Sequence, residues 1–391
     1  MLRVERDQIL AFRLGSHHLT ARLPAGSLAA AAAACGIQDT PLNTAPLAFR
    51  ARLEGLGPED VGRALTADKS LLGVWSVRGA PYVVPSGEAA VFTTGALPVD
   101  ERSFGVFLGG WAASVQAAGL SVLGLLDAMA QAATQALDRQ ALPIEDLRGQ
   151  LAQRVPALAR LSRPSGAHAD LPEPLVRALG LLGLVCIAAQ PGSDPRVART
   201  DANVTRTDRW LGRPPPGGDR RQARAELARR FFHCYGPSTP RAFAEWTTRS
   251  FADAEDTFAL LEGELVGVEA AGTQAWVLAG DAGVLADPSQ ADGVRLLPPQ
   301  DPYLQQRDRT TLLPDKALHP QVWRPVRPPG VVLAAGQPVA TWRSRRAGRH
   351  LAVTVEPLGR LPAPTRAAIQ AEADRIALLR GCQAAQLTVA G

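Results

Sequence analysis

The alternation of apolar and polar positions between residues 227 and 279 predicts two helices joined by a tight turn, then a third helix and a β-hairpin. An arginine-rich amphipathic segment stops at Tyr235-Gly236-Pro237, because Gly commonly ends a helix and Pro cannot continue it. Ser238-Thr239-Pro240 then supplies an N-cap and a first-turn Pro for the next helix. The third helix and two strands are expected over residues 252–261, 264–269 and 274–279. This order predicts a winged helix that contains a helix-turn-helix.

The same order of elements recurs twice earlier in the chain. Near the N-terminus, three helical segments precede two short strands separated by Arg78-Gly79-Ala80. These helices and strands are expected over residues 23–34, 45–53, 58–65, 72–77 and 82–85. In the middle of the chain, a helix, a strand, a turn and a polar strand are expected over residues 175–182, 183–189, 190–195 and 196–205. The middle pattern is also explained by the apolar runs that any α+β protein contains.

Two linkers and a β-rich segment complete the pattern. Residues 211–220 and 280–293 are rich in Pro, Gly or polar residues, which is typical of domain boundaries. Beyond them, a β-meander and a closing amphipathic helix are expected over residues 331–333, 339–343, 351–355 and 365–379. The sequence therefore predicts an α+β fold with four domains, at residues 1–98, 99–212, 220–280 and 294–391.

Six short motifs, in this order, resemble those of the bacterial winged-helix DNA glycosylases of the AlkZ and YcaQ kind. None is specific alone, but together they extend from about residue 19 to residue 381. The motifs are Gly36-Ile37-Gln38, Trp75-Ser76-Val77-Arg78-Gly79, Arg209-Trp210-Leu211-Gly212, Tyr235-Gly236-Pro237, Leu296-Leu297-Pro298 with Asp301-Pro302-Tyr303-Leu304, and Thr341-Trp342-Arg343. The resemblance implies three tandem winged-helix units, a C-terminal β-barrel-like domain and a concave face that binds DNA.

The resemblance places the candidate catalytic residues at Gln38, Asp39 and Thr40. The family's tripeptide is Gln, an apolar residue, then Gln or Asp, so Asp39 and Thr40 depart from it. Excision of an alkylated purine requires an oriented water and stabilisation of an oxocarbenium-like sugar, which carboxylates or carboxamides provide. Asp39 and Thr40 also have structural interpretations, as a partner of a helix dipole and as an N-cap before Pro41. Side chains 38 and 40 share one side of an extended segment, and side chain 39 lies on the other.

Composition adds an arginine-rich surface to this picture. The 391 residues include 42 Lys and Arg against 37 Asp and Glu, and only Lys69 and Lys316 are lysines. A coding bias towards Arg, Ala, Gly and Pro is one explanation. The other is DNA contact, because a guanidinium pairs bidentately with phosphate and with guanine. The predicted DNA-binding residues are Arg78, Arg206, Arg209, Arg220, Arg221, Arg224, Arg343 and Arg345.

The sequence contains few signals of other chemistry. It has no phosphate-binding or dinucleotide-binding glycine loop, no nucleophile elbow and no His-Glu-x-x-His motif. Its one adjacent histidine pair, His17-His18, is expected to be exposed and solvated. The cysteines lack metal-binding spacing and predict reduced, mostly buried thiols. We therefore expect no metal, no cofactor and no membrane span, since the longest apolar runs fall short of ~20 residues, and a cytoplasmic, nucleoid-associated protein.

Two hypotheses from different classes remain open. In the first, the chain is a monofunctional DNA glycosylase that excises N-alkylated purines. In the second, it is a DNA-binding protein or transcriptional regulator without catalysis. Three winged units suit a monomer that wraps double-stranded DNA, alkylated or not, better than a dimer on a palindrome.

Overall fold

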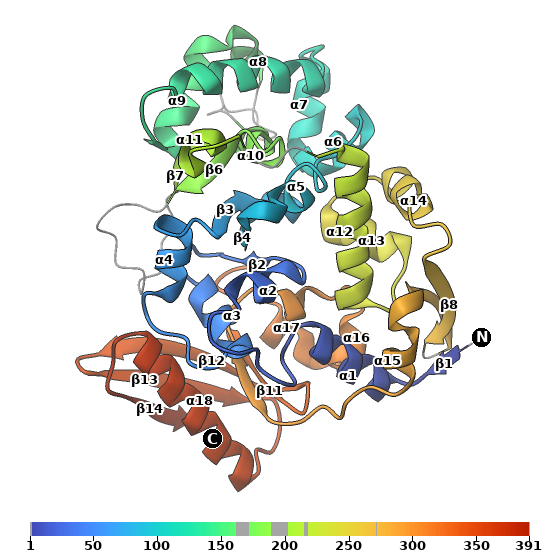
Figure 1. Cartoon of the computed structure of the whole chain (residues 1–391), viewed down its shortest axis with the longest axis vertical. Helices are drawn as coiled ribbons and strands as arrows, with labels where there is room; N and C mark the ends of the chain where they lie inside the picture. The colour runs from blue at the N-terminus through green and yellow to red at the C-terminus, as the bar shows by residue number, and fades with distance from the viewer. Residues whose placement is uncertain (1, 162–171, 189–201, 215–217, 271, 391) are drawn as a thin grey trace.

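The computed structural model describes the chain except for residues 1, 162–171, 189–201, 215–217, 271 and 391. Its fold is mixed α/β, and the described strands form sheets of six, three and five strands. Figure 1 shows the helices α8 and α9 at one end of the molecule and the C-terminal sheet at the other, with strand β2 between them. The predicted turn at residues 190–195 lies outside the described residues, as do residue 189 and residues 196–201 of the predicted strands that flank it.

The first two predicted hairpins belong to a single six-stranded sheet with antiparallel neighbours. They meet at the pair Gly73↔Ile187. A Cβ on Gly73 would lie 2.9 Å from the Ile187 carbonyl oxygen, so the close approach of the strands requires glycine here. In spatial order the strands are β2 (Ile37–Gln38), β4 (Pro81–Pro85), β3 (Leu71–Trp75), β6 (Val185–Ala188), β7 (Asn203–Arg206) and β5 (Leu142–Pro143).

The three helices predicted before the first hairpin are present, and a further helix over Arg6–Ser16 was not predicted. The helix expected over residues 23–34 begins only at Leu28, because Gly26 adopts a positive φ of 86° in the turn before it. The helices of this segment are α1 (Arg6–Ser16), α2 (Leu28–Ala33), α3 (Ala45–Arg52) and α4 (Asp60–Thr66).

The middle of the chain is mainly helical. Its helices are α5 (Ala89–Phe92), α6 (Glu101–Leu108), α7 (Ala112–Ala117), α8 (Val122–Ala136), α9 (Ile144–Arg154), α10 (Glu173–Leu181) and α11 (Thr207–Leu211). Within the described residues, no single helix has both the length and the apolar composition to cross a membrane. The segments Glu101–Ala117 and Val122–Ala136 meet those criteria only as a pair, which is bent by 100°.

The predicted helix-turn-helix segment has the expected elements in the expected order. Its elements are α12 (Arg220–Tyr235), α13 (Pro240–Thr247), α14 (Phe251–Ala259), β8 (Leu265–Ala270) and β9 (Thr273–Leu278). The hydroxyl of Thr239 accepts the Ala242 N–H and caps α13 as predicted. The strand β1 (Leu2–Val4) was not predicted; it pairs in parallel with β8, so this sheet has the order β1-β8-β9.

The expected β-barrel-like domain is not confirmed, because the described strands of the C-terminal segment form an open sheet. The sheet has the order β10-β11-β12-β13-β14, which leaves β10 and β14 at its edges among the described strands. The last strand joins β13 in parallel after the crossover helix α18, and α18 also packs on β10 and β14. The elements are β10 (Val294–Leu297), β11 (Gly330–Ala334), β12 (Gln337–Ala347), β13 (His350–Pro357), α18 (Ala363–Leu379) and β14 (Ala384–Val389).

Short elements connect these units. They are η1 (Val77–Gly79), η2 (Ser86–Glu88), η3 (Gly109–Trp111), η4 (Pro156–Arg160), η5 (Ala279–Asp281), α15 (Ala282–Ala286), η6 (Pro302–Gln305), α16 (Arg309–Leu312), η7 (Lys316–Leu318) and α17 (His319–Val322). The largest hydrophobic core runs in sequence from Cys35 to Leu261 and so joins the first sheet, the middle helices and α12–α14. The C-terminal sheet and α18 enclose a second core.

The expected solvated histidine pair was wrong for His17. The turn that ends α1 directs its ring into the interior. There it packs edge to face against the rings of Tyr235 and Tyr303, with distances between ring centroids of 5.2 and 5.5 Å. All four cysteines are free and buried, as predicted.

Candidate active site

The segment that carries Gln38 is fixed between a sheet edge and a helix. Gln38 pairs with Tyr82 across β2 and β4, and the Asp39 N–H donates to the Pro81 carbonyl. Before this strand, Gly36 has a φ of +73°, and a Cβ there would lie 2.9 Å from the Tyr82 ring. A glycine is therefore required at the entrance to the segment. Figure 1 shows β2 in the centre of the molecule, close to α2.

Asp39 points away from Gln38 and caps α3. Its carboxylate accepts the backbone N–H groups of Asn43, Thr44 and Ala45 at 3.0, 2.7 and 2.7 Å. Burial raises the pKa of the Asp39 carboxyl above its ordinary value, and these hydrogen bonds oppose the shift. The expected support of a helix terminus by Asp39 is found. The expected N-cap role of Thr40 was wrong, because α3 begins only at Ala45.

Gln38 and Thr40 share the other side of the segment, as the sequence predicts. The Gln38 amide nitrogen donates to the Thr40 hydroxyl at 3.3 Å. The Gln38 amide oxygen accepts from the Arg78 guanidinium at 2.9 Å and from the Tyr82 hydroxyl at 3.3 Å. Because a guanidinium only donates, it fixes which end of the amide faces it. In the described part of the chain, none of these partners of Gln38 is a carboxylate.

Arg78 brings together four parts of the fold. It lies in η1, between β3 and β4, with a φ of 61° that non-glycine residues rarely adopt. Besides Gln38, its guanidinium donates to the Trp246 carbonyl at 2.9 Å, to the Gln305 amide oxygen at 3.0 Å and to the Tyr82 hydroxyl at 3.3 Å. Within the described residues Arg78 has no carboxylate partner, so its positive charge remains uncompensated beside Gln38.

Three neighbours of this group were missed in the sequence. Tyr82 is buried, and burial raises the pKa of its hydroxyl, which therefore stays protonated and donates to Gln38. Gln305 directly follows the recognised motif that ends at Leu304, so its position was a usable signal. Arg307 is half-buried, with an Nε that is shielded from solvent and has no hydrogen-bond partner among the described residues. Burial and the charge of Arg78 lower the pKa of Arg307 to about 10, so it too is cationic at neutral pH.

A cavity of about 410 Å³ lies on the Asp39 side of the segment, and Gln38 is not among the residues that line it. Its walls include Asp39, Asn43, Glu59, Gly73 and Trp210. The two oxygens of Asp39 are already engaged by three N–H groups. Asp39 therefore reaches this cavity as the cap of a helix terminus and not as a carboxylate that is free to act as a base.

Most of the predicted DNA-binding arginines contact the protein itself. Arg206 pairs with Asp208 at 2.6 Å, Arg209 with Asp138 at 2.9 Å, and Arg224 with the buried Asp253 at 2.9 Å. Arg220 donates to the Pro98 carbonyl at 2.6 Å, and Arg343 donates to the Arg327 carbonyl at 2.7 Å. The three ion pairs compensate the charges of Arg206, Arg209 and Arg224. Contact of these five residues with DNA stays a prediction.

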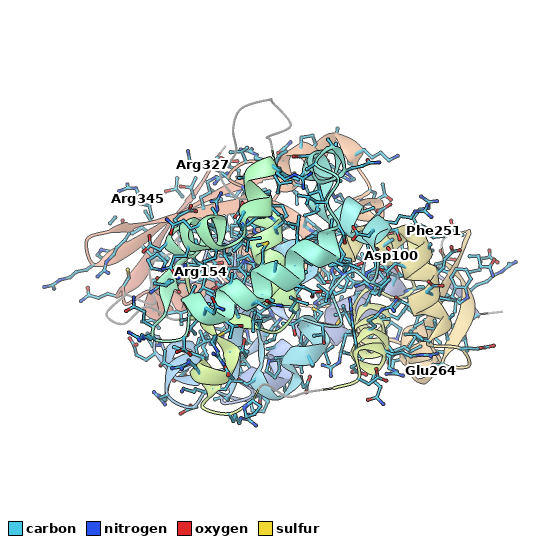
Figure 2. All side chains as sticks on the ribbon, turned by 90° about the horizontal axis from the view of Figure 1, so that it is seen from above. Asp100, Arg154, Phe251, Glu264, Arg327 and Arg345 are labelled. Carbon is cyan, nitrogen blue, oxygen red and sulfur yellow. The ribbon has the colours of Figure 1, made fainter. Side chains whose placement is uncertain are left out.

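Arg221 and Arg345 differ from the other predicted residues. Both are exposed, and within the described residues neither side chain forms an ion pair. Figure 2 shows Arg345 and Arg327 on the same side of the molecule, at the C-terminal sheet. Of the eight predicted arginines, only Arg78 is brought into contact with Gln38.

Comparison with known proteins points to one family. Residues 31–379 match the model of a family described as DNA glycosylase AlkZ-like. The fold is similar to the solved structure of Streptomyces sahachiroi DNA glycosylase AlkZ, with a TM-score of 0.74, 22% sequence identity and coverage of 100% of both chains. No curated protein matches the sequence.

Proposed function

The chain belongs to the AlkZ-like DNA glycosylase family, and from this premise we propose that it binds double-stranded DNA and hydrolyses the N-glycosidic bond of N-alkylated purines. The observation that carries this proposal is the pairing of Gln38 with Thr40 on one side of the segment, beside Arg78. The family match supports a function of the DNA-repair glycosylase kind. The substrate and the residues that act on it are our proposal.

In the proposed reaction, the bond between C1′ and the purine nitrogen breaks and its electron pair passes to the base. A cationic N-alkylated purine leaves as a neutral base. Water then adds to the oxocarbenium-like sugar and loses a proton to the solvent. The Thr40 hydroxyl accepts from Gln38 and keeps its own proton and a second lone pair, so together the two side chains can orient this water.

The electrostatics favour a narrow substrate range. Arg78 and Arg307 are cationic, and Asp39 is committed to the terminus of α3. A site with two guanidinium groups, and with no carboxylate among the described partners of Gln38, stabilises positive charge on the sugar poorly. The leaving base must therefore supply most of the activation, which restricts the substrates to cationic N-alkylated purines.

We also propose how DNA is held. The elements α12–α14 with β8 and β9 have the order of a winged helix, and we assign them that role. In this proposal the protein acts as a monomer on the nucleoid in the cytoplasm.

A second function has one observation in its favour. The lack of a carboxylate among the described partners of Gln38 suits a DNA-binding relative without catalysis. Such a protein would bind duplex DNA but release no base.

Release of free base from alkylated duplex DNA by the purified full chain separates the two functions. We expect slow release of cationic N-alkylated purines, which Gln38→Ala lowers by about 100-fold or more because an orienting group is lost. DNA affinity should stay within roughly twofold in this variant, since a small polar side chain adds little to a phosphate-dominated interface.

Asp39→Asn is the matched control, because it changes the neighbouring residue on the opposite side of the segment. We expect it to alter stability more than rate. Cleavage that survives Gln38→Ala and vanishes with Asp39→Asn would show that Asp39 is the acting residue. Absence of base release from the wild-type chain, with DNA binding retained, would favour the second function.

A further inference from the structure

Three groups that commonly bind metals meet in the core, apart from the contacts of Gln38. His17 follows α1, Cys35 precedes β2, and Cys234 lies in the last turn of α12. Their exposed fractions are 0%, 3% and 0%. The three residues come from distant parts of the sequence, so no spacing motif connects them. The fold alone creates this cluster.

The distance between two of the three ligand atoms fits a tetrahedral zinc site. The ligand atoms of the three residues all lie within 4.8 Å of one another. The Cys35 sulfur is 3.7 Å from Nδ1 of His17. Zinc bonds of about 2.3 Å to sulfur and about 2.0–2.1 Å to nitrogen place these two atoms roughly 3.5 Å apart at a tetrahedral angle. The side chains can therefore receive an ion with small adjustments.

The charge balance also suits an ion in this place. One Zn²⁺ with two thiolates and a neutral imidazole forms a neutral unit, which limits the cost of burying it. With Nδ1 bound to the ion, the remaining proton of the neutral imidazole lies on Nε2, which is shielded from solvent and has no hydrogen-bond partner among the described residues.

We propose that His17, Cys35 and Cys234 bind one zinc ion that has a structural role. Water completes the coordination, because the nearby Tyr235 hydroxyl already donates to the Pro302 carbonyl at 2.9 Å. Three protein ligands are also typical of catalytic zinc, but these ligands are buried and out of reach of a substrate. The ion links α1, α12 and the segment that leads to Gln38, three residues after Cys35. This inference does not depend on glycosylase activity.

Zinc content of the full chain, purified under reducing conditions and equilibrated with zinc, tests the site by mass spectrometry of the metal. We expect about one zinc per chain, and loss of most of it in Cys35→Ala and in Cys234→Ala, because each removes a ligand. Cys186→Ala is the matched control. It removes another fully buried cysteine, on β6, which belongs to no such cluster among the described residues. This variant should keep its zinc.

Cobalt provides an independent readout of the ligands. The Co²⁺-loaded chain should show thiolate-to-metal charge-transfer absorption, which disappears in Cys234→Ala and persists in Cys186→Ala. If Cys234→Ala does not fold, the Tm of the wild-type chain decides, since it should rise with excess zinc and fall with a chelator. No zinc uptake and no shift of Tm would overturn the proposal. Equal zinc loss in Cys186→Ala, or a Cys35–Cys234 disulfide in place of the metal, would overturn it as well.

Discussion

Asp39 and Gln38 are adjacent in sequence but serve opposite sides of the same segment. The alternation of an extended backbone directs Gln38 and Thr40 together and sends Asp39 to the start of α3. The Asp39 carboxylate satisfies three N–H groups that would otherwise lack partners at that helix terminus. Its contacts indicate a contribution to stability that can be measured apart from any activity.

Asp39→Ala should lower the free energy of unfolding by about 2 kcal/mol, because it removes a cap and leaves buried N–H groups unpaired. Urea denaturation measures this loss. Asp100→Ala is the matched control, since Asp100 caps α6 through one N–H, that of Ser103. That variant should lose about 1 kcal/mol. An equal or smaller loss at Asp39 would mean that its hydrogen bonds add little to the fold.

The relation of Gln38 to Thr40 was predictable because it depends only on local alternation. The contact of Arg78 with Gln38 was not, because it requires the register of β2 on β4, which brings Tyr82 opposite Gln38. Gln305, which contacts Arg78, lies 227 residues further along the chain. Sequence patterns carry local geometry well, whereas this network arises from long-range packing.

At the scale of elements, strong local signals predicted where helices begin and end. The pairing of strands that are distant in the sequence was not predicted. Thr239 and Pro240 defined the start of α13, and Gly236 followed the end of α12. The open C-terminal sheet was not predicted, because β14 follows a crossover helix and pairs in parallel with β13. The pairing of β1 with β8 was also not predicted, because the two strands lie far apart in the sequence.

The element α12 carries a pH-dependent contact. His233 lies 2.8 Å from the Asp281 carboxylate of η5, and this hydrogen bond raises the pKa of the histidine, against desolvation and the charge of Arg230. A raised pKa in the folded state means that the contribution to stability is complete below the ordinary pKa of ~6.5. It is lost as the pH rises through the higher pKa of the folded state.

His233→Gln should therefore destabilise the chain more at a pH of ~5.5 than at a pH of ~9, on either side of the histidine transition. Urea denaturation of the wild-type chain and of the His233→Gln variant, at each of the two pH values, measures the difference in their free energies of unfolding. In the Asp281→Asn background, the pH dependence of this difference should shrink, because the charged partner is absent. The same destabilisation at both pH values would show that Asp281 does not raise the pKa of His233.

For the molecule as a whole, DNA binding depends more on which arginines are already paired than on the total net charge. The chain has a formal net charge of +5, but many arginines are engaged with aspartates or backbone carbonyls. An arginine neutralises a phosphate only if its guanidinium is free to leave its partner. Exposed arginines without ion pairs are therefore the first candidates for DNA contact, ahead of those in dense sequence clusters.

The salt dependence of binding to duplex DNA distinguishes the two groups. Each phosphate contact contributes about −0.9 to the slope of log affinity against log salt. Arg221→Ala and Arg345→Ala should each flatten that slope by about 0.9, as measured by fluorescence anisotropy. The double variant Arg206→Ala with Arg209→Ala should flatten the slope by less than about 0.9 per arginine. The reason is that Asp208 and Asp138 already compensate the two guanidinium groups. Flattening by roughly 1.8 in the double variant would mean that both ion pairs open on DNA. An unchanged slope in every variant would leave coding bias as the explanation of these arginines.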